Sequence, residues 1–207
     1  MTSYTGTNGV NDTIIGGNGN GDILDSNVST GADSLVNNGT NSTFMVNNIA
    51  DIVVDNDVTH SGLIVSNVSW NLGSTRSTGV NHLTLTGSGN LTGTGNSNGN
   101  VLVSSMTGIN KLIGNGTVAS DTFHVNHAGD TVTENGTGTA DHVISNISFT
   151  LGANLENLTL TGTGGLTGTG NTLANLIHGN ANTTGNTVLS DGGAAGVDTL
   201  IGHSVSG

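Results

Sequence analysis

The residues with the clearest chemical potential are aspartates that follow turns rich in Gly and Asn. Asp12, Asp22 and Asp33 lie ten and eleven residues apart, and each has an apolar residue two positions later. Gly and Asn accept left-handed backbone conformations, so such turns can direct several carbonyl oxygens toward one carboxylate. Calcium binds about six to eight oxygen ligands of these kinds. The spacing therefore predicts calcium sites at consecutive turns.

Less complete versions of this pattern occur further along the chain. Asp121 and Asp198 lack part of the Gly-rich lead, and Ser42 and Asn110 stand where the pattern would place an aspartate. We therefore expect the middle of the chain to bind little metal. The predicted calcium ligands are Asp12, Gly17, Gly19, Asp22, Asp33, Asp121, Asp191 and Asp198.

A second interpretation applies to each of these aspartates. Asp and Asn residues that precede a strand commonly accept hydrogen bonds from the backbone of their own turn. Each aspartate is therefore explained equally well as a turn former and as a metal ligand. The sequence leaves both interpretations open.

The other ionisable residues form no pattern typical of a catalytic site. His124 and His127 are three residues apart, a spacing that places them on opposite faces of a strand. The zinc-protease pattern His-Glu-x-x-His is absent. Glu134 and Glu156 are too far apart in the sequence to be interpreted as a catalytic carboxylate pair. We therefore expect the protein not to be an enzyme.

The composition is dominated by three residue types. Gly, Asn and Thr account for 35, 30 and 32 of the 207 residues, and there is no Cys or Pro. With 14 acidic residues against Lys111 and Arg76, the net charge of −12 repels phosphate, so nucleic-acid binding is not expected. No apolar run reaches the roughly 18 residues that cross a bilayer, so membrane insertion is not expected. The start of the chain lacks the features of a cleavable leader.

The local pattern favours short strands. Apolar residues fall into clusters of about four, as at residues 43–46 and 199–201, and Gly, Asn, Asp or Ser separates the clusters. Gly, Asn, Thr, Ser and Val are poor helix formers, and no segment repeats apolar residues at helical spacing. We expect many strands of about three to five residues, tight turns and almost no helix.

A long internal duplication predicts how these strands are arranged. Residues 44–54 match residues 123–133 at an offset of 79 positions, and residues 83–87 match residues 158–162 at an offset of 75. The offset drops because the first copy carries four extra residues around positions 74–79. Stacked units tolerate such a loop insertion. We therefore expect one elongated domain over residues 1–207, with copies at residues 42–116 and 121–202.

The segment Gly17-Asn18-Gly19-Asn20-Gly21-Asp22-Ile23-Leu24-Asp25 resembles a known repeat. It is similar to the unit Gly-Gly-x-Gly-x-Asp-x-apolar-x of the RTX, or hemolysin-type calcium-binding, family of secreted bacterial proteins. Together with the duplication, this resemblance implies an all-β fold, a right-handed parallel β-solenoid or β-roll stabilised by Ca²⁺. It also implies type I secretion to the extracellular space or the cell surface.

The functional expectation is a secreted, non-enzymatic structural protein that self-assembles. Neither end of the predicted stack looks capped, so we expect a head-to-tail homo-oligomer that forms a filament, matrix or surface layer. A cell surface or a glycan is a further candidate contact. Two alternatives stay open: a carrier segment of a larger secreted protein, and an ice- or surface-binding module. The second is suggested by the strings Thr92–Asn96 and Thr167–Asn171, which are similar to ice-binding repeats.

Overall fold

The computed structural model describes residues 1–7, 9–26, 30–117, 119–179, 188–193 and 197–202. Within these ranges the chain is all-β and contains no helix, and the strands stack as a parallel β-solenoid. The predicted fold class is therefore confirmed. In the described part of the chain, no helix is long and apolar enough to cross a membrane.

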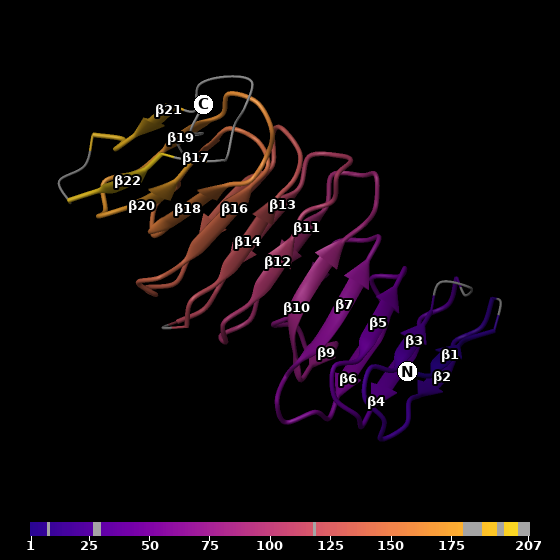
Figure 1. Cartoon of the computed structure of the whole chain (residues 1–207). Coiled ribbons are helices and arrows are strands. Elements are labelled where there is room, and N and C mark those ends of the chain that lie inside the picture. The colour runs from indigo at the N-terminus through magenta and orange to yellow at the C-terminus, as the bar shows by residue number, and fades with distance from the viewer. Residues whose placement is uncertain (8, 27–29, 118, 180–187, 194–196, 203–207) are drawn as a thin grey trace.

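One face of the solenoid is a continuous parallel sheet of eleven strands, which we call the long sheet (Figure 1). The strands that belong to it are, in spatial order, β1 (Ser3–Thr5), β3 (Ile23–Asp25), β5 (Thr43–Val46), β7 (Gly62–Ser66), β10 (Val80–Leu85), β12 (Val101–Val103), β14 (Thr122–Val125), β16 (His142–Ser145), β18 (Asn157–Leu160), β20 (Leu176–His178) and β22 (Thr199–Ile201).

The opposite face consists of three shorter parallel sheets, which together we call the second face. Their strands are β2 (Thr13–Ile15), β4 (Ser34–Asn37), β6 (Ile52–Asp55) and β9 (Ser77–Thr78); β8 (Trp70–Asn71), β11 (Thr92–Thr94), β13 (Lys111–Gly114) and β15 (Thr131–Glu134); and β17 (Phe149–Thr150), β19 (Thr167–Thr169) and β21 (Val188–Ser190).

Each coil contributes one strand to each face, except that the coil between β7 and β10 contributes both β8 and β9 to the second face, and successive coils are about 20 residues apart. Ile23 pairs with Thr43, and Thr43 pairs with Leu63. A coil is thus two strands with their turns, slightly longer than two nonapeptide units. Four successive strand pairs lead from Phe44 to Ile64, then to Leu83, Leu102 and Phe123. The 79-residue offset of the duplication therefore equals four coils.

The change in offset also has a structural origin. His142 pairs with Asn157 only 15 residues later, whereas the corresponding coil of the first copy pairs Leu63 with His82, 19 residues later. The extra residues of the first copy form β9, which pairs with β6. The insertion therefore adds a short strand to the second face and leaves the long sheet uninterrupted.

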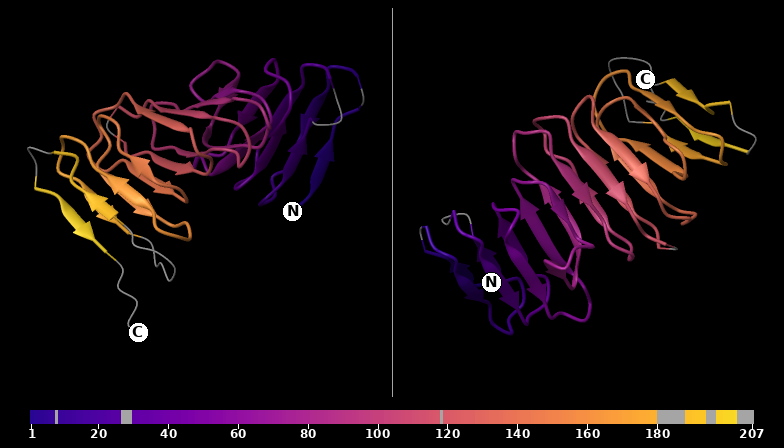
Figure 2. Two further views of the ribbon diagram at one scale, coloured as in Figure 1. Left: turned by 90° about the horizontal axis from the view of Figure 1, so that it is seen from above. Right: turned by 180° about the vertical axis from the view of Figure 1, so that it is seen from behind.

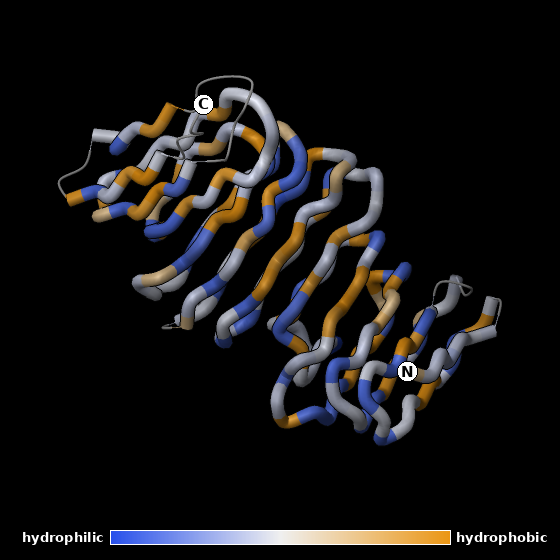
Figure 3. The backbone as a smooth tube through the Cα atoms, viewed as in Figure 1, coloured by the Kyte–Doolittle hydropathy of each residue, from blue (hydrophilic) through white to orange (hydrophobic). Residues whose placement is uncertain are grey.

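The core contains one row of apolar side chains that the long sheet directs inward, and apolar residues of the second face, such as Leu35, Val53 and Leu112, pack in the same core. Strand side chains alternate between faces, so the middle residue of each strand points toward the second face. Figure 3 shows hydrophobic segments on these strands, with more hydrophilic residues in the turns between them. The residues of this core row are Leu24, Phe44, Ile64, Leu83, Leu102, Phe123, Val143, Leu158 and Ile177, all with 0% exposure.

The molecule is elongated, with β1 and β22 at opposite ends of the stack (Figures 1 and 2). Each inner coil contacts only the coil before and the coil after it, so its apolar residue is covered by those two neighbours. The stability of such a stack is approximately a sum of unit and nearest-neighbour terms.

We expect Phe123→Ala to lower the free energy of unfolding by about 3–5 kcal/mol, because a fully buried aromatic ring leaves a cavity between two neighbouring coils. Met106→Ala, at a position that is 75% exposed, is the matched control and should change it by less than about 0.5 kcal/mol. Urea unfolding followed by far-ultraviolet circular dichroism measures both. Equal effects of the two substitutions would contradict the assignment of the core row.

Candidate metal centre

The aspartates that precede strands connect consecutive coils. The backbone N–H of Asp12 donates to Asp33 Oδ1 at 2.8 Å, and the N–H of Asp33 donates to Asp51 Oδ1 at 2.8 Å. Asn100 N donates in the same way to Asp121 Oδ1 at 2.7 Å. Each carboxylate therefore satisfies a backbone donor of the previous coil, at the point where the chain enters a strand. We call this arrangement the aspartate ladder.

The same carboxylates also hold their own turns. Asp22 is buried, its Oδ2 accepts the N–H of Gly17 at 3.1 Å, and its Oδ1 accepts the N–H of Thr2 at 3.1 Å. A Cβ at Gly19 would lie 3.5 Å from Asp22 Oδ1, so the turn wraps closely around this side chain. Gly17 thus contributes a backbone donor here, which favours the turn-forming interpretation of Asp22. Calcium at this turn stays a prediction.

The remaining predicted ligands are spread over several turns. Asp12 and Asp33 precede β2 and β4 on the second face, whereas Asp22 precedes β3 of the long sheet. Near the end of the chain, Asp191 is exposed and accepts the N–H of Gly193 at 3.0 Å, and Asp198 Oδ1 accepts the N–H of Asn175 at 2.9 Å. None of these aspartates belongs to a converging group of three or more His, Cys, Asp or Glu side chains in the described part of the chain.

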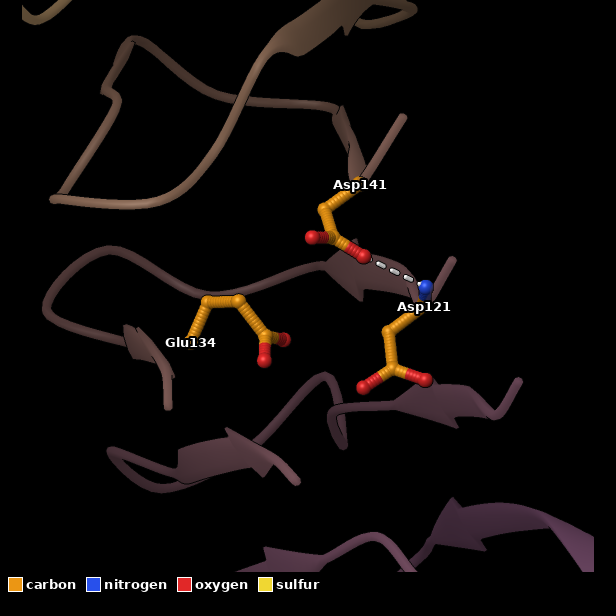
Figure 4. A group of neighbouring side chains, drawn as sticks. All are labelled: Asp121, Glu134 and Asp141. Atoms are coloured by element: carbon orange, nitrogen blue, oxygen red, sulfur yellow. Dashed lines mark hydrogen bonds between the residues drawn. The ribbon is translucent and has the colours of Figure 1, made fainter. Parts of the chain in front are cut away.

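One group of acidic residues does converge. Asp121, Glu134 and Asp141 each offer a carboxylate oxygen, and these three oxygens lie within 4.8 Å of one another (Figure 4). Among the described residues this is the only group of three or more His, Cys, Asp or Glu side chains that meets this criterion. We call it the acidic triad. Asp121 was predicted as a ligand from the sequence, whereas Glu134 and Asp141 were not.

The two faces of the solenoid position the triad together. Asp121 precedes β14 and Asp141 precedes β16, so they are consecutive members of the aspartate ladder on the long sheet. Glu134 ends β15 on the second face, in the coil between them. All three side chains are buried, with exposures of 0%, 5% and 1% for Asp121, Glu134 and Asp141.

One oxygen of each triad carboxylate is used by the backbone. Asp121 Oδ1 accepts the N–H of Asn100, Asp141 Oδ1 accepts the N–H of Asp121 at 2.6 Å, and Glu134 Oε1 accepts the N–H of Gly136 at 2.6 Å. The other three oxygens, Asp121 Oδ2, Glu134 Oε2 and Asp141 Oδ2, are buried and have no hydrogen-bond partner. A buried polar group without a partner is costly, and a buried unpaired charge is more so.

Gly114 provides the space for two of these oxygens. A Cβ at Gly114, the last residue of β13, would overlap Glu134 Oε2 and lie 2.5 Å from Asp121 Oδ2. Only a glycine therefore lets both carboxylates approach the same stretch of backbone.

The electrostatics of the triad follow from burial and from mutual repulsion. Burial, together with the charges of Asp121 and Asp141, raises the pKa of Glu134 to about 7, although the hydrogen bond from Gly136 lowers it. Burial likewise raises the pKa of both Asp121 and Asp141. Without a cation, a proton on Glu134 relieves part of the repulsion and can be donated to Asp121. With a cation, the proton is displaced.

The first copy of the duplication has one carboxylate where the second copy has three. At the 79-residue offset, Ser42, Asp55 and Gly62 stand for Asp121, Glu134 and Asp141. Asn37 pairs with Asp55 as Gly114 pairs with Glu134, so an amide side chain occupies the position of the glycine.

Asn37, just before the first copy, fills the corresponding space with an uncharged amide. Its Nδ2 donates to Ser42 Oγ at 2.7 Å and to the carbonyl oxygen of Gly39 at 2.8 Å. Asp55 is the single carboxylate, and burial raises its pKa to about 6. The concentration of negative charge therefore belongs to the second copy alone.

The donor set of the triad determines which ion it can hold. It offers three carboxylates and no nitrogen or sulfur, a set that favours hard cations such as Ca²⁺, Mg²⁺ or Mn²⁺ over zinc or copper. Three orphaned oxygens within a buried space fit such an ion, because it would neutralise charges that otherwise repel one another.

Comparison with known proteins identifies no relative: no protein-family model, no curated protein and no solved structure matches the chain. Membership of the RTX family therefore stays a prediction that rests on the motif at residues 17–25.

We expect the calcium-free protein to lose stability as the pH rises from about 4.5 to about 7. Glu134 is more basic in the folded state, so its contribution is complete below the ordinary glutamate pKa and is lost as the pH passes its raised pKa of about 7. The loss should reach up to about 3 kcal/mol. Urea unfolding in a chelator at a series of pH values measures it.

Glu134→Gln is the test variant, because glutamine does not titrate. It should flatten most of this pH dependence, and the rest should come from the other carboxylates with raised pKa values, which include Asp55, Asp121 and Asp141. An unchanged slope in Glu134→Gln would show that the triad does not hold a proton.

Proposed function

We propose that the protein is a non-enzymatic structural β-solenoid whose folded state is stabilised by calcium bound at Asp121, Glu134 and Asp141. Two observations on the same three residues carry this proposal: one carboxylate oxygen of each lies within 4.8 Å of the others, and each has one buried oxygen without a hydrogen-bond partner. An ion there would connect β14 and β16 of the long sheet to β15 of the second face. The ion would therefore link the two faces of the solenoid to each other and would also link two consecutive coils.

Calcium is the preferred ion for two reasons. It accepts irregular coordination by six to eight oxygens, so that backbone carbonyls and water can complete a site with three carboxylates. Magnesium demands near-ideal octahedral geometry and gives up its water reluctantly. The buried triad offers no wide opening in which a magnesium ion could keep most of its water.

The burial of the triad also argues against catalysis by these residues. Asp121 and Asp141 are 0% and 1% exposed, so a substrate cannot reach them without opening the solenoid. A cavity of about 270 Å³ lies beside Trp70, and its lining includes no carboxylate and no histidine. These observations support a structural role.

Residues 95–99 have the pattern Gly-x-Ser-x-Gly, with Ser97 at its centre. This pattern is typical of the turn that carries the nucleophilic serine of some hydrolases. That motif requires a sharp turn from a strand into a helix. Here Ser97 lies in an exposed turn between β11 and β12, two strands on opposite faces of the solenoid. We therefore assign it no catalytic role.

Ice binding gains no supporting observation. Thr92 and Thr94 point outward from β11, but their partners on β13 are Lys111 and Ile113. The row of threonine side chains is therefore interrupted at the next coil, whereas an ice-binding face needs a long regular array.

We expect calcium to raise the stability of the wild-type protein and of Asp130→Asn, but not of Asp121→Asn. At about 100 times the dissociation constant, binding adds about 2.7 kcal/mol. Asparagine at 121 keeps an acceptor for the N–H of Asn100 and removes the charge. Asp130 is the matched control, because it accepts the N–H of Asn110 at 2.7 Å in a neighbouring turn outside the triad. Thermal unfolding with and without millimolar calcium measures the shift.

Two results would change this account. An unchanged melting temperature of the wild-type protein in calcium would show that calcium does not stabilise the fold. A calcium response that survives in Asp121→Asn and disappears in Asp22→Ala would move the site to the turn at residues 17–22.

Secretion and head-to-tail assembly belong to the same proposal, and they rest mainly on the family resemblance. One structural observation supports stacking of a further coil. Leu200 of β22 pairs with the fully buried Ile177 and thus stands in the core row, but it is 42% exposed. The first coil of a second copy, laid on β22, would cover it.

We expect concentrated protein with calcium to form filaments or sheets in electron micrographs, because such contacts repeat without closing. Leu200→Asp should abolish them and leave the calcium-dependent melting unchanged, which separates assembly from ion binding. If the wild-type protein stays monomeric by light scattering and forms no fibres, the carrier-segment alternative replaces assembly.

A further inference from the structure

The cavity of about 270 Å³ beside Trp70 lies where the second face is interrupted. β8 and β9 belong to the same coil, yet they are edge strands of two different sheets of that face. The cavity is lined by Trp70 and Asn71 of β8, by Thr92 and Thr94 of β11, and by Arg76 from the turn before β9. Its lining includes no carboxylate, so the one charge that it presents is positive.

The two fixed positive charges of the chain both lie at this cavity. Arg76 lines it, and Lys111 of β13 is the register partner of Thr92 in its wall. Register partners of parallel strands point to the same face, so Lys111 lies on the outward surface next to Thr92. Both cations are exposed, and within the described part of the chain neither side chain forms an ion pair or a hydrogen bond. A chain with 14 acidic residues thus gathers its unpaired positive charge in one place.

The four-residue insertion of the first copy positions Arg76. The N–H of Arg76 donates to Ser74 Oγ at 3.3 Å, and the carbonyl oxygen of Arg76 accepts the N–H of Val53 at 2.7 Å. The backbone of Arg76 is therefore held between its own turn and β6. Its side chain takes no part in these contacts, so its charge can be removed without disturbing them.

The second copy has a hollow of about 300 Å³ at the corresponding place. Phe149 stands there for Trp70 at the 79-residue offset, and Asp130 contributes a carboxylate to the lining. The insertion is absent from this copy, so no residue corresponds to Arg76. The hollow of the second copy therefore presents the opposite charge.

Lys111 has no basic counterpart in the second copy either. Val188 stands in its place, because Val188 pairs with Thr167 as Lys111 pairs with Thr92. The two copies thus share the strands around the hollow but differ in its charge. The scaffold alone does not account for the two cations at the first cavity.

We propose that the cavity of the first copy binds a sugar acid, a single sugar ring whose carboxylate pairs with Arg76. The planar guanidinium group of arginine holds a carboxylate through two parallel hydrogen bonds. The hydroxyls of Thr92 and Thr94 and the amide of Asn71 are suitable partners for sugar hydroxyls. Trp70 adds an apolar wall for the C–H groups of the ring.

Size and charge both favour this ligand. The cavity of about 270 Å³ is just below the range of about 300–1,000 Å³ that holds drug-sized ligands, so it suits a single ring. Repulsion from distant carboxylates is screened, because the screening length is about 8 Å at physiological ionic strength. A nucleic acid would extend over the neighbouring acidic turns and is still repelled.

The fluorescence of Trp70 tests the proposal, because Trp70 is the only tryptophan of the chain. We expect glucuronate to change the emission of the wild-type protein in calcium, with a dissociation constant on the order of 1 mM. Glucose, which has the same ring without the carboxylate, should leave the emission unchanged. Arg76→Gln should weaken glucuronate binding at least about tenfold, because it removes a charged hydrogen-bond donor. Lys111→Gln should weaken it less, because Lys111 lies one strand away.

A transplanted tryptophan is the matched control. In the double variant Trp70→Phe, Phe149→Trp, the single tryptophan lies at the hollow of the second copy, and its emission should not respond to glucuronate. Circular dichroism and melting curves confirm that each variant is folded.

A hyaluronan tetrasaccharide with glucuronate at its non-reducing end distinguishes two sources of the same ligand. Tighter binding than glucuronate assigns the cavity to the end of an acidic polysaccharide, and equal or weaker binding assigns it to a free sugar acid.

Three outcomes would overturn the proposal: no change in emission at glucuronate concentrations well above the expected dissociation constant, an equal response to glucose, or an Arg76→Gln variant that binds glucuronate as tightly as the wild type. Inorganic phosphate that competes as strongly as glucuronate would indicate a general anion site and would equally overturn the sugar. None of these outcomes bears on calcium binding at the acidic triad, whose residues lie in other coils.

Discussion

The hydrogen bond from the backbone N–H at a strand entrance to an aspartate of the next coil is the constraint on which the other features depend. Sheet hydrogen bonds join the strands, but the residue before each strand would otherwise leave a buried donor unsatisfied. Asp33 and Asp51 satisfy two such donors on the second face, and Asp121 and Asp141 satisfy two on the long sheet. Because coils repeat, their carboxylates stack as well. The same ladder that aligns the turns therefore concentrates negative charge.

The acidic triad is the place, among the described residues, where three carboxylates meet. Asp121 and Asp141 are ordinary ladder members, and one oxygen of each is used as in other coils. Glu134 adds a third carboxylate from the second face, and Gly114 leaves the space for it. In the first copy, Asn37 fills that space with an amide, and only Asp55 remains. The two copies thus differ in charge at two positions, Ser42 against Asp121 and Gly62 against Asp141, while the corresponding strands pair in the same way.

The distribution of charge over the whole molecule follows the same logic. Acidic residues occupy turns and strand ends, where backbone donors accompany them, so the strands of the long sheet are left almost without charge. Inward positions fill with apolar side chains because a thin core tolerates little else. Outward positions are free of that requirement, yet several of them are apolar too. Folding explains the apolar inward positions.

The sequence by itself determined the class of the fold, because alternating apolar clusters between Gly- and Asn-rich turns suit strands and nothing else. It also located the duplication, whose 79-residue offset proves to be four coils. It identified Asp121 but not Asp141 or Glu134. Asp141 carries the local signal, an apolar residue two positions later, whereas Glu134 lies at the end of a strand and carries none. Only the tertiary structure brings Glu134 close to Asp121 and Asp141. Contacts between the two faces depend on the number of residues in the turns of each coil, which the local sequence pattern does not give.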